Sequence, residues 1–323
     1  MEAKTSSLCM METLSGCPGS LTPAARTFRR TASVARTGCH DHELRRLLDS
    51  GSLHPLQDSH MTTGILPANQ ILERLKSGNT AVGTMVGTFA QSSMPVLLAN
   101  AGFDFFLLDN EHGMFDYETM ETLCRVAVSH GITPIVRPAD HTYTWTAKVL
   151  DTGAQGLLMP RVYTVEQVRS IISMAKYPPA GIRGSALSRA YVGYKNANAM
   201  EVMAEANEQS MLCIQIETKE SYAVRDEIAA LPEVDCLFVG PNDFSISLGH
   251  PGNMDHPDVT SAIENVLDTC RRFNKVAGIQ MNTPESACRW ARAGFNMLSA
   301  GSDVGLLQNA GQTLTGQVRD AWN

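Results

Sequence analysis

The chain has 323 residues and a mass of 35.1 kDa, more than one average domain but suited to a single large α/β barrel with an appendage. With 43% hydrophobic and 18% charged residues it can bury a large core, which excludes both a small disulfide-stapled module and wholesale disorder. The formal net charge of −7 argues against a nucleic-acid partner. No apolar run is long enough to span a membrane, so we expect a soluble protein without a membrane partner.

Residues 1–60 differ in composition from the rest of the chain. They are rich in Ser, Thr and Arg and lack a sustained apolar period, so we expect a disordered N-terminal extension. Such a start is also typical of an organellar transit peptide, although Glu2 and Glu12 weaken that interpretation. An alternative start at Met61 or an expression-vector remnant is the third interpretation. We expect a cytoplasmic protein, or a mitochondrial one if the leader is a transit peptide.

From about residue 64 onward, short apolar runs alternate with helical patterns. The expected strands are residues 81–89, 103–109, 133–137, 156–160, 212–217, 236–240, 277–281 and 297–300. The helices expected between them include residues 117–130, 164–176, 220–231, 258–274 and 284–293. Eight such units predict one (β/α)8 TIM barrel over residues 61–323. An open doubly wound sheet is the alternative, and the missing GxGxxG after the first strand disfavours it.

Two further features carry structural expectations. The eight cysteines contain no CxxC pair, and we expect Cys213, Cys236, Cys270 and Cys288 to be buried, reduced core residues. The connection over residues 177–200, between the fourth and fifth strands, is too long for an ordinary loop. Its Arg183 and Arg189 are candidates either for gating the site or for building a subunit interface.

Polar residues gather where the expected strands end. In a TIM barrel the carboxyl ends of the strands converge on one mouth, which is where catalytic residues lie. A single acid at such a place is usually a solvated loop residue or a helix cap. Here, however, five consecutive strands end in polar or charged residues. The five strand ends are Asp109–His112, Arg137, Arg161, residues 215–217 and residues 240–243.

Two of these acids predict a metal site. Glu217 and Asp243 lie one βα unit apart, so they should point into the same mouth, with Gln215 nearby. An oxygen-rich donor set suits Mg²⁺ or Mn²⁺ better than zinc. The plainer alternative is that Asp243 only caps the helix that follows it.

His112 and Arg137 are the candidates for proton transfer and charge stabilisation. Histidine carries protons near neutral pH, and Arg137 supplies a permanent positive charge for a developing anion. A lysine Schiff base is the rival mechanism, but the nearest lysine, Lys219, is expected to begin a solvent-facing helix.

Seven blocks then carry a family likeness. In order and spacing they resemble the HpcH/HpaI aldolase/citrate lyase family, in particular its metal-dependent (class II) pyruvate aldolase branch, which includes 4-hydroxy-2-oxoheptanedioate, 2-dehydro-3-deoxyglucarate and 2-keto-3-deoxy-L-rhamnonate aldolases. The likeness runs from about Leu66 to Leu307 and implies a TIM barrel of the phosphoenolpyruvate/pyruvate-domain type. The blocks are LLDNEHGMFD, IVRP, VLDTGAQGLLMP, GIRGSALSRA, IQIET, VGPNDFSISLG and AGSDVGLL.

The resemblance implies roles for the same residues. Glu217 and Asp243 would hold a divalent metal, Mg²⁺ or Mn²⁺ with Co²⁺ as a further candidate, and no organic cofactor is expected. Arg137 is similar to the family's transition-state stabiliser and His112 to its general base. The pyruvate-binding groups would be Gln215, Gly240, Pro241, Asn242 and the backbone of Asp243.

Which aspartate assists His112 stays open at this point. The resemblance implies Asp151, but Asp151 precedes the fourth strand and should lie at the opposite end of the barrel. Geometry therefore favours Asp109, unless Asp151 reaches across a subunit contact or through a local distortion. The family commonly assembles as hexamers, so a homo-oligomer is expected.

The implied activity is reversible cleavage of a 4-hydroxy-2-oxo acid to pyruvate and an aldehyde through a pyruvate enolate. The alternative is an oxaloacetate decarboxylase or a macrophomate-synthase-like enzyme that uses the same enolate. A lyase acting on malyl or citramalyl thioesters lacks an evident nucleotide-binding cluster. A non-catalytic barrel would have no need to keep His112, Arg137, Glu217 and Asp243 together. Arg161 departs from the family pattern, and we expect it to bind an acceptor aldehyde that carries a carboxylate or several hydroxyls.

Overall fold

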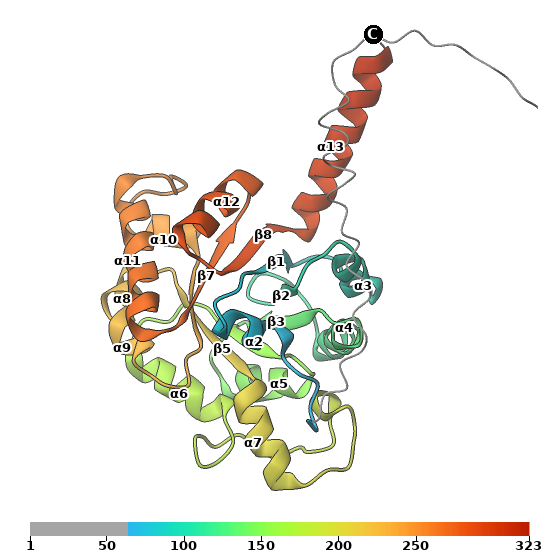
Figure 1. The fold of residues 1–323 in the computed structure, drawn as a ribbon, viewed down its shortest axis with the longest axis vertical. Coiled ribbons are helices and arrows are strands. Elements are labelled where there is room, and N and C mark those ends of the chain that lie inside the picture. Colours follow the sequence, from blue (N-terminus) through green and yellow to red (C-terminus); the bar gives the residue numbers. More distant parts are fainter. Residues whose placement is uncertain (1–63, 323) are drawn as a thin grey trace, which may run out of the picture. The chain divides into compact units, whose positions relative to one another are not determined.

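The computed structural model describes residues 64–322, so the expected N-terminal extension and its transit-peptide interpretation lie outside the described residues. Eight parallel strands close into a barrel in chain order, with helices around it (Figure 1). The strands are β1 (Ala81–Val86), β2 (Phe105–Asp109), β3 (Thr133–Arg137), β4 (Gly156–Met159), β5 (Met211–Ile216), β6 (Cys236–Val239), β7 (Val276–Met281) and β8 (Met297–Ser302).

The helices follow the strands in alternation. They are α2 (Gln70–Lys76), α3 (Ser93–Asn100), α4 (Tyr117–Ser129), α5 (Val149–Asp151), α6 (Val165–Ala175), α7 (Ala199–Gln209), α8 (Lys219–Ala223), α9 (Arg225–Ala229), α10 (Pro241–Ser247), α11 (Pro257–Phe273), α12 (Pro284–Ala293) and α13 (Asp303–Trp322), with a π-helix η1 (Thr144–Lys148) and a 3₁₀ helix η2 (Ala190–Val192). The predicted TIM barrel is confirmed, and every expected strand is present.

One expected helix is divided in two. The stretch predicted as a single helix over residues 220–231 forms α8 and α9, and the chain turns between them at Val224, where φ is −104° and ψ is 14°. The Arg225 side chain donates to the carbonyl of Tyr222 at 2.8 Å, which satisfies an acceptor that the broken helix would leave free. Apolar periodicity runs through the break and therefore does not reveal it.

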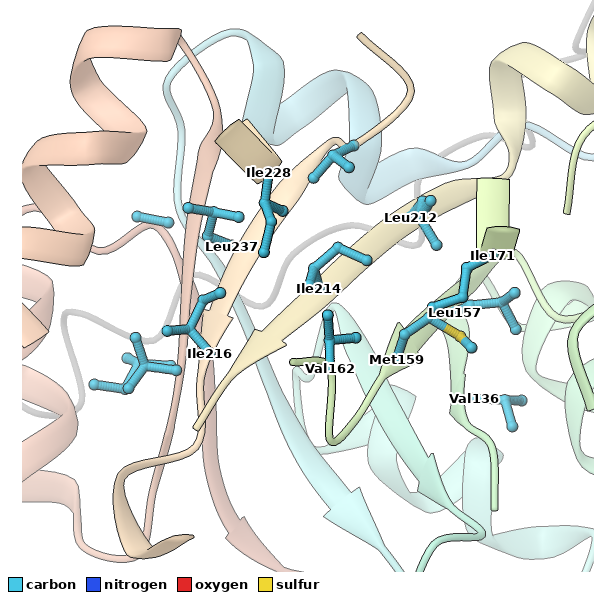
Figure 2. Packing of buried hydrophobic residues seen from close by; sticks show 14 of the residues in the cluster. Val136, Leu157, Met159, Val162, Ile171, Leu212, Ile214, Ile216, Ile228 and Leu237 are labelled. Atoms are coloured by element: carbon cyan, nitrogen blue, oxygen red, sulfur yellow. The ribbon is translucent and has the colours of Figure 1, made fainter. Parts of the chain in front are cut away.

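The barrel interior is filled by every second residue of the strands. Phe105 and Leu107 of β2 belong to the same buried cluster as Ile135 of β3 and Phe238 of β6. The intervening residues, such as Phe106 and Leu108, pack into the layer between strands and helices, part of which Figure 2 shows. Because successive side chains of a strand face opposite sides, this alternation fixes which residues reach the barrel axis.

The amino end of the barrel is closed by packing. Ile71, Leu72 and Leu75 of α2 join the interior cluster there. The long connection follows α6 and forms a small core of its own, so it does not lie at the carboxyl end of the strands. Arg183 is buried in that region, and the expectation that it gates the mouth of its own barrel is wrong.

Two further expectations concern the burial of the cysteines and the length of apolar helices. Cys213, Cys236 and Cys270 are buried and free, as predicted, whereas Cys288 is exposed. Cys288 lies on α12, whose buried side chain is Trp290, so the thiol falls on the solvent face of that helix. Within residues 64–322 no helix is both long and apolar enough to cross a membrane.

Candidate active site

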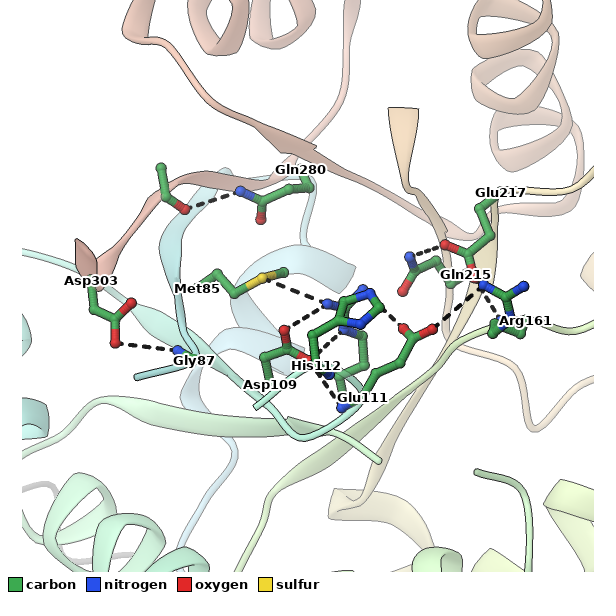
Figure 3. Close-up of polar contacts among 12 residues, drawn as sticks. Met85, Gly87, Asp109, Glu111, His112, Arg161, Gln215, Glu217, Gln280 and Asp303 are labelled. Atoms are coloured by element: carbon green, nitrogen blue, oxygen red, sulfur yellow. Dashed lines mark hydrogen bonds and ion pairs between the residues drawn. The ribbon is translucent and has the colours of Figure 1, made fainter. Parts of the chain in front are cut away.

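The last inward-facing residue of several strands is polar, which places a charged cluster at the mouth of the barrel. Asp109 follows Phe105 and Leu107 in the alternation of β2, and it is in register with Arg137 at the end of β3. Both side chains are buried. The expected convergence of strand ends is therefore observed for these two residues. Figure 3 shows Asp109 among the polar residues of the mouth.

Arg137 is held by two carboxylates. Its Nε donates to Oδ1 of Asp109 at 2.9 Å and its Nη2 donates to Oδ2 at 2.8 Å, while Nη1 lies 3.1 Å from Oε2 of Glu111. Burial alone would lower the pKa of Arg137, but the hydrogen bond and charge of Asp109, with the charges of Glu111 and Glu217, outweigh it and raise the pKa. The guanidinium is thus a fixed positive charge in a bidentate arrangement.

Glu217 is the most deeply buried acid of the cluster. It is 1% exposed, its Oε1 accepts the Arg161 N–H at 2.7 Å, and its Oε2 accepts from the Gln215 amide. Burial, together with the charges of Glu111 and Asp243, raises the pKa of Glu217 to about 7, even though the Arg161 N–H and Arg137 act in the opposite direction. A buried carboxylate beside other carboxylates is stabilised in its charged form by a nearby positive charge.

Arg161 occupies an unusual backbone conformation. Its φ is 52°, in the left-handed region that residues with a Cβ atom rarely adopt. This conformation directs its N–H to Glu217, and its side chain, 55% exposed, places Nη1 3.9 Å from Oε1 of Glu111. Local strain of this kind is retained where the surrounding structure requires the geometry.

Gly240, directly after β6, stands where a side chain has no room. A Cβ at this position would lie 2.6 Å from Nε2 of Gln215 and 3.0 Å from Oε2 of Glu217, which is too close for a side chain. Pro241 begins α10, and Asn242 and Asp243 stand in its first turn. Asp243 is half-buried, and its charge acts on Glu217, so the two predicted metal ligands face the same region.

The cluster as a whole matches a divalent cation. Four carboxylates, those of Asp109, Glu111, Glu217 and Asp243, lie near two guanidinium groups, those of Arg137 and Arg161, which leaves an excess of two negative charges when all four carboxylates are ionised. The buried Oε1 of Gln215 has no hydrogen-bond partner. Oxygen donors, excess negative charge and an unsatisfied amide oxygen are what a hard divalent ion binds.

His112 lies at the same mouth but is exposed. Its backbone N–H lies 3.3 Å from Oδ1 of Asp109, which also accepts the Glu111 N–H at 3.0 Å. Asp109 therefore orders the backbone that carries the imidazole and holds Arg137. In Figure 3 the ring lies beside Asp109 and Glu111.

Asp151 is not part of this cluster. It ends α5, before β4, and its Oδ1 accepts from Nη2 of Arg183 at 2.8 Å. The geometric expectation that Asp151 lies at the opposite end of its own barrel agrees with this position. Lys219, the lysine considered for a Schiff base, is exposed at the start of α8, as expected.

Two residues of the site were not singled out from the sequence. Glu111 lies in the same DNEH run as Asp109 and His112, and its carboxylate contacts both Arg137 and Arg161. Asp303, at the start of α13, is buried and accepts the backbone N–H groups of Gly87, Thr88 and Phe89 at 3.3, 2.8 and 2.9 Å. In the sequence Glu111 is visible only as an acid in the run after β2, and its two arginine partners lie 26 and 50 residues further along the chain. The role of Asp303 depends on contacts more than 200 residues apart.

The fold and the site together define an enzyme class: a TIM barrel whose mouth holds a buried arginine and clustered carboxylates. The chain belongs to the HpcH/HpaI aldolase/citrate lyase family, whose model matches residues 86–310.

Individual relatives agree with this assignment. The chain is 36% identical to the hydroxypyruvate/pyruvate aldolase of Pseudomonas aeruginosa, over 79% of this chain and 94% of that protein. It is 35% identical to the 4-hydroxy-2-oxo-heptane-1,7-dioate aldolase of Salmonella dublin, over 76% and 93%. The crystal structure of an HpcH/HpaI aldolase from Desulfitobacterium hafniense DCB-2 has a TM-score of 0.73 and 30% identity, covering 76% of this chain and 95% of that one. These matches confirm the resemblance read from the sequence blocks.

Proposed function

We propose that this chain is a divalent-metal-dependent aldolase that reversibly cleaves a 4-hydroxy-2-oxo acid to pyruvate and an aldehyde. The chain is a carbon–carbon lyase by its family and its aldolase relatives. The observation that carries the proposal is the fixed guanidinium of Arg137 beside the carboxylates of Glu217 and Asp243 at one barrel mouth. This arrangement suits the stabilisation of an enolate.

Glu217 and Asp243 are the proposed metal ligands. Mg²⁺ or Mn²⁺ suits an all-oxygen set, and Co²⁺ is the further candidate. When bound, the cation would polarise the 2-oxo group of the substrate. No organic cofactor is required by the proposal, because the residues at the mouth supply the remaining charges and proton carriers.

Substrate binding is assigned to the end of β5 and the start of α10. We propose that Gln215 and the backbone N–H groups of Asn242 and Asp243, which have no acceptor within the first turn of the helix, hold the pyruvate part. Gly240 keeps space open beside Gln215, and Pro241 places the start of the helix. Arg137 would face the oxygen on which negative charge develops.

His112 is the proposed proton carrier. In the cleavage direction it takes the proton of the 4-hydroxyl group, the C3–C4 bond breaks, and the bonding electrons pass to the 2-oxo group to give the enolate. The aldehyde leaves, and the proton held by the imidazole becomes available to C3 of the enolate, which forms pyruvate. His112 is exposed at the mouth, so the substrate can reach it.

The two aspartates receive different proposed roles. Asp109 positions Arg137 and the backbone of His112 within the chain. Asp151, which precedes β4, pairs with Arg183 of the long connection and would meet a His112 only across a subunit boundary. The proposal therefore includes a homo-oligomer, a hexamer by family resemblance. It also keeps one barrel over residues 61–323, a separate extension over residues 1–60, and a cytoplasmic location unless that extension is a transit peptide.

Arg161 is the proposed acceptor-binding residue. Its guanidinium is more than half exposed and reaches the mouth beside Glu111, so it can bind an aldehyde that carries a carboxylate or several hydroxyls. We expect Arg161→Ala to lower kcat/KM for a carboxylated aldehyde about 10-fold or more while leaving an uncharged aldehyde within about 2-fold. The measurement is kcat/KM with both aldehydes. An unchanged acceptor preference contradicts this role.

The function is tested by pyruvate release from a panel of racemic 4-hydroxy-2-oxo acids, with oxaloacetate included. The chelator-treated protein is assayed before and after addition of Mg²⁺, Mn²⁺ or Co²⁺. Metal-dependent cleavage of a panel member supports the proposal, and the best member identifies the acceptor class.

Two outcomes would overturn it. Release from oxaloacetate alone would favour the decarboxylase or the macrophomate-synthase-like alternative. Activity that survives thorough chelation would mean that Glu217 and Asp243 are misassigned, and a lysine Schiff base would have to be sought by borohydride trapping.

A further inference from the structure

Three side chains with metal-binding atoms meet between α10 and α11. His250 follows α10, His256 is the N-cap of α11, and Asp258 stands in the first turn of α11. One ligand atom from each lies within 4.8 Å of the other two. Nε2 of His250 is 3.0 Å from Oδ2 of Asp258, and Nδ1 of His256 is 3.7 Å from the same oxygen.

The two imidazoles are arranged as a pair. Their ring centroids are 3.5 Å apart and the planes are inclined by 15°. Nδ1 of His256 accepts the backbone N–H of Asp258 at 3.2 Å, so this nitrogen is unprotonated, and a metal bound there would replace that long hydrogen bond. Neutral imidazole is the form that binds metals.

We propose that His250, His256 and Asp258 form a second metal site, selective for a transition metal such as Zn²⁺. A zinc ion holds its ligands at about 2.0–2.1 Å, which separates ligand atoms in a tetrahedron by roughly 3.3 Å. The two distances to the Asp258 oxygen, 3.0 and 3.7 Å, bracket that separation, so modest side-chain rotation is sufficient. The half-exposed setting leaves the fourth position for water.

The donor chemistry separates this site from the mouth of the barrel. Two imidazoles and one carboxylate suit Zn²⁺, whereas the oxygen-only set at Glu217 and Asp243 suits Mg²⁺ or Mn²⁺. The proposal does not depend on the proposed aldolase activity.

A metal here would join the two helices on either side of the loop. The His250 N–H donates to the carbonyl of Ser245 at 2.8 Å, and Oγ of Ser245 donates to the carbonyl of Asn242 at 2.7 Å. The same Oγ accepts the Gly252 N–H at 3.2 Å. Bound metal would therefore stabilise the loop and, through Ser245, the end of the short helix that carries Asp243.

The alternative explanation is that His256 serves only as the N-cap of α11. A substitution that keeps the cap but removes the imidazole distinguishes this explanation from a metal site. His256→Asn keeps a strong N-cap residue but removes the imidazole. His250→Gln removes the second imidazole without touching the cap. His130→Gln, which changes an exposed histidine outside the cluster, is the matched control.

The experiment measures Zn²⁺ binding to the tag-free, chelator-treated full chain by calorimetry, in excess Mg²⁺ so that the mouth is occupied. We expect one equivalent of Zn²⁺ and a rise in melting temperature for the wild type and for His130→Gln. Both cluster variants should bind at least 10-fold more weakly, and zinc X-ray absorption should report two imidazole ligands in the wild type.

Retention of tight binding by His250→Gln and His256→Asn together would overturn the proposal. Loss of zinc binding in Glu217→Gln alone would place the ion at the mouth and overturn it as well. Failure of pyruvate release would leave this result untouched, since no turnover is measured.

Discussion

Arg137 is a charged residue that is 5% exposed, and its position is tolerable only because Asp109 and Glu111 surround the guanidinium. Burial of an unpaired charge is costly, and removal of one partner leaves the other charge uncompensated. The same pairing fixes the orientation of the planar guanidinium at the mouth. Stability and preorganisation thus come from the same contacts.

Arg137→Lys tests this preorganisation. A lysine keeps the charge but not the bidentate fork, so we expect kcat/KM for pyruvate release to fall about 10²–10³-fold. The free energy of unfolding should fall by about 2 kcal/mol, because buried acceptors on Asp109 lose donors. Steady-state kinetics and urea denaturation measure the two effects. Arg125→Lys, on the surface of α4, is the control, and wild-type kinetics in Arg137→Lys would refute the assignment.

Asp303 has a different task, because its carboxylate satisfies three backbone N–H groups of the segment that follows β1. Asp303→Ala leaves these part-buried backbone donors without their acceptor, and we expect a loss of about 1–2 kcal/mol in the free energy of unfolding. Asp303→Asn keeps one acceptor oxygen and should lose less. Urea denaturation measures both, with Asp320→Ala on the exposed end of α13 as the control. Equal stability of Asp303→Ala and the wild type would show that water replaces the carboxylate.

At the scale of elements, α13 stands apart from the others, because it leaves the barrel after β8 and extends away from it (Figure 1). Leu307, Leu314 and Val318 are 63%, 62% and 63% exposed and recur at seven- and four-residue steps, so they share one face of the helix. An apolar face of this length on an exposed helix is a typical protein-interaction surface. It is the element on which the proposed homo-oligomer is best tested.

The test replaces the middle of this face by charge. Leu314→Glu should shift the assembly toward smaller species by at least one dissociation step, since a buried leucine contributes about 2 kcal/mol and a buried carboxylate opposes contact. Light scattering after size exclusion measures the mass. Asn309→Glu, on the opposite face, adds the same charge and should leave the mass unchanged. An identical mass for Leu314→Glu and wild type would exclude α13 from the interface.

At the scale of the whole molecule, the sequence predicted the barrel because strand alternation and helix periodicity are local signals. The strand ends that carry Asp109, Arg137, Gln215 and Glu217 followed from the rule that such ends converge. The helix break at Val224 and the solvent-facing side of α12 depend on tertiary packing, which periodicity does not report. The link between Glu111 and its two arginines depends on side-chain directions. Asp303 binds the backbone of residues 87–89, more than 200 positions earlier in the sequence.

The stability of the whole metal-free molecule should depend on the titration of Glu217. Its pKa is raised from 4.5 to about 7, so between these pH values the folded chain keeps a proton that the unfolded chain has lost. The free energy of unfolding therefore falls as pH rises through this window and levels off above it. Since one pKa unit corresponds to about 1.4 kcal/mol, the full effect is on the order of 3 kcal/mol.

Glu217→Gln isolates this contribution, because glutamine does not titrate. In the presence of chelator, the difference in unfolding free energy between wild type and Glu217→Gln should become more unfavourable to the wild type as pH rises from 4.5 to about 7. Excess Mg²⁺ or Mn²⁺ should reverse the loss in the wild type alone, because a bound cation compensates the carboxylates. Urea denaturation at several pH values measures the difference, with the exposed Glu285→Gln as control. Parallel pH profiles for wild type and Glu217→Gln would show that the Glu217 carboxylate keeps an ordinary pKa and that its surroundings accept the charge without a metal.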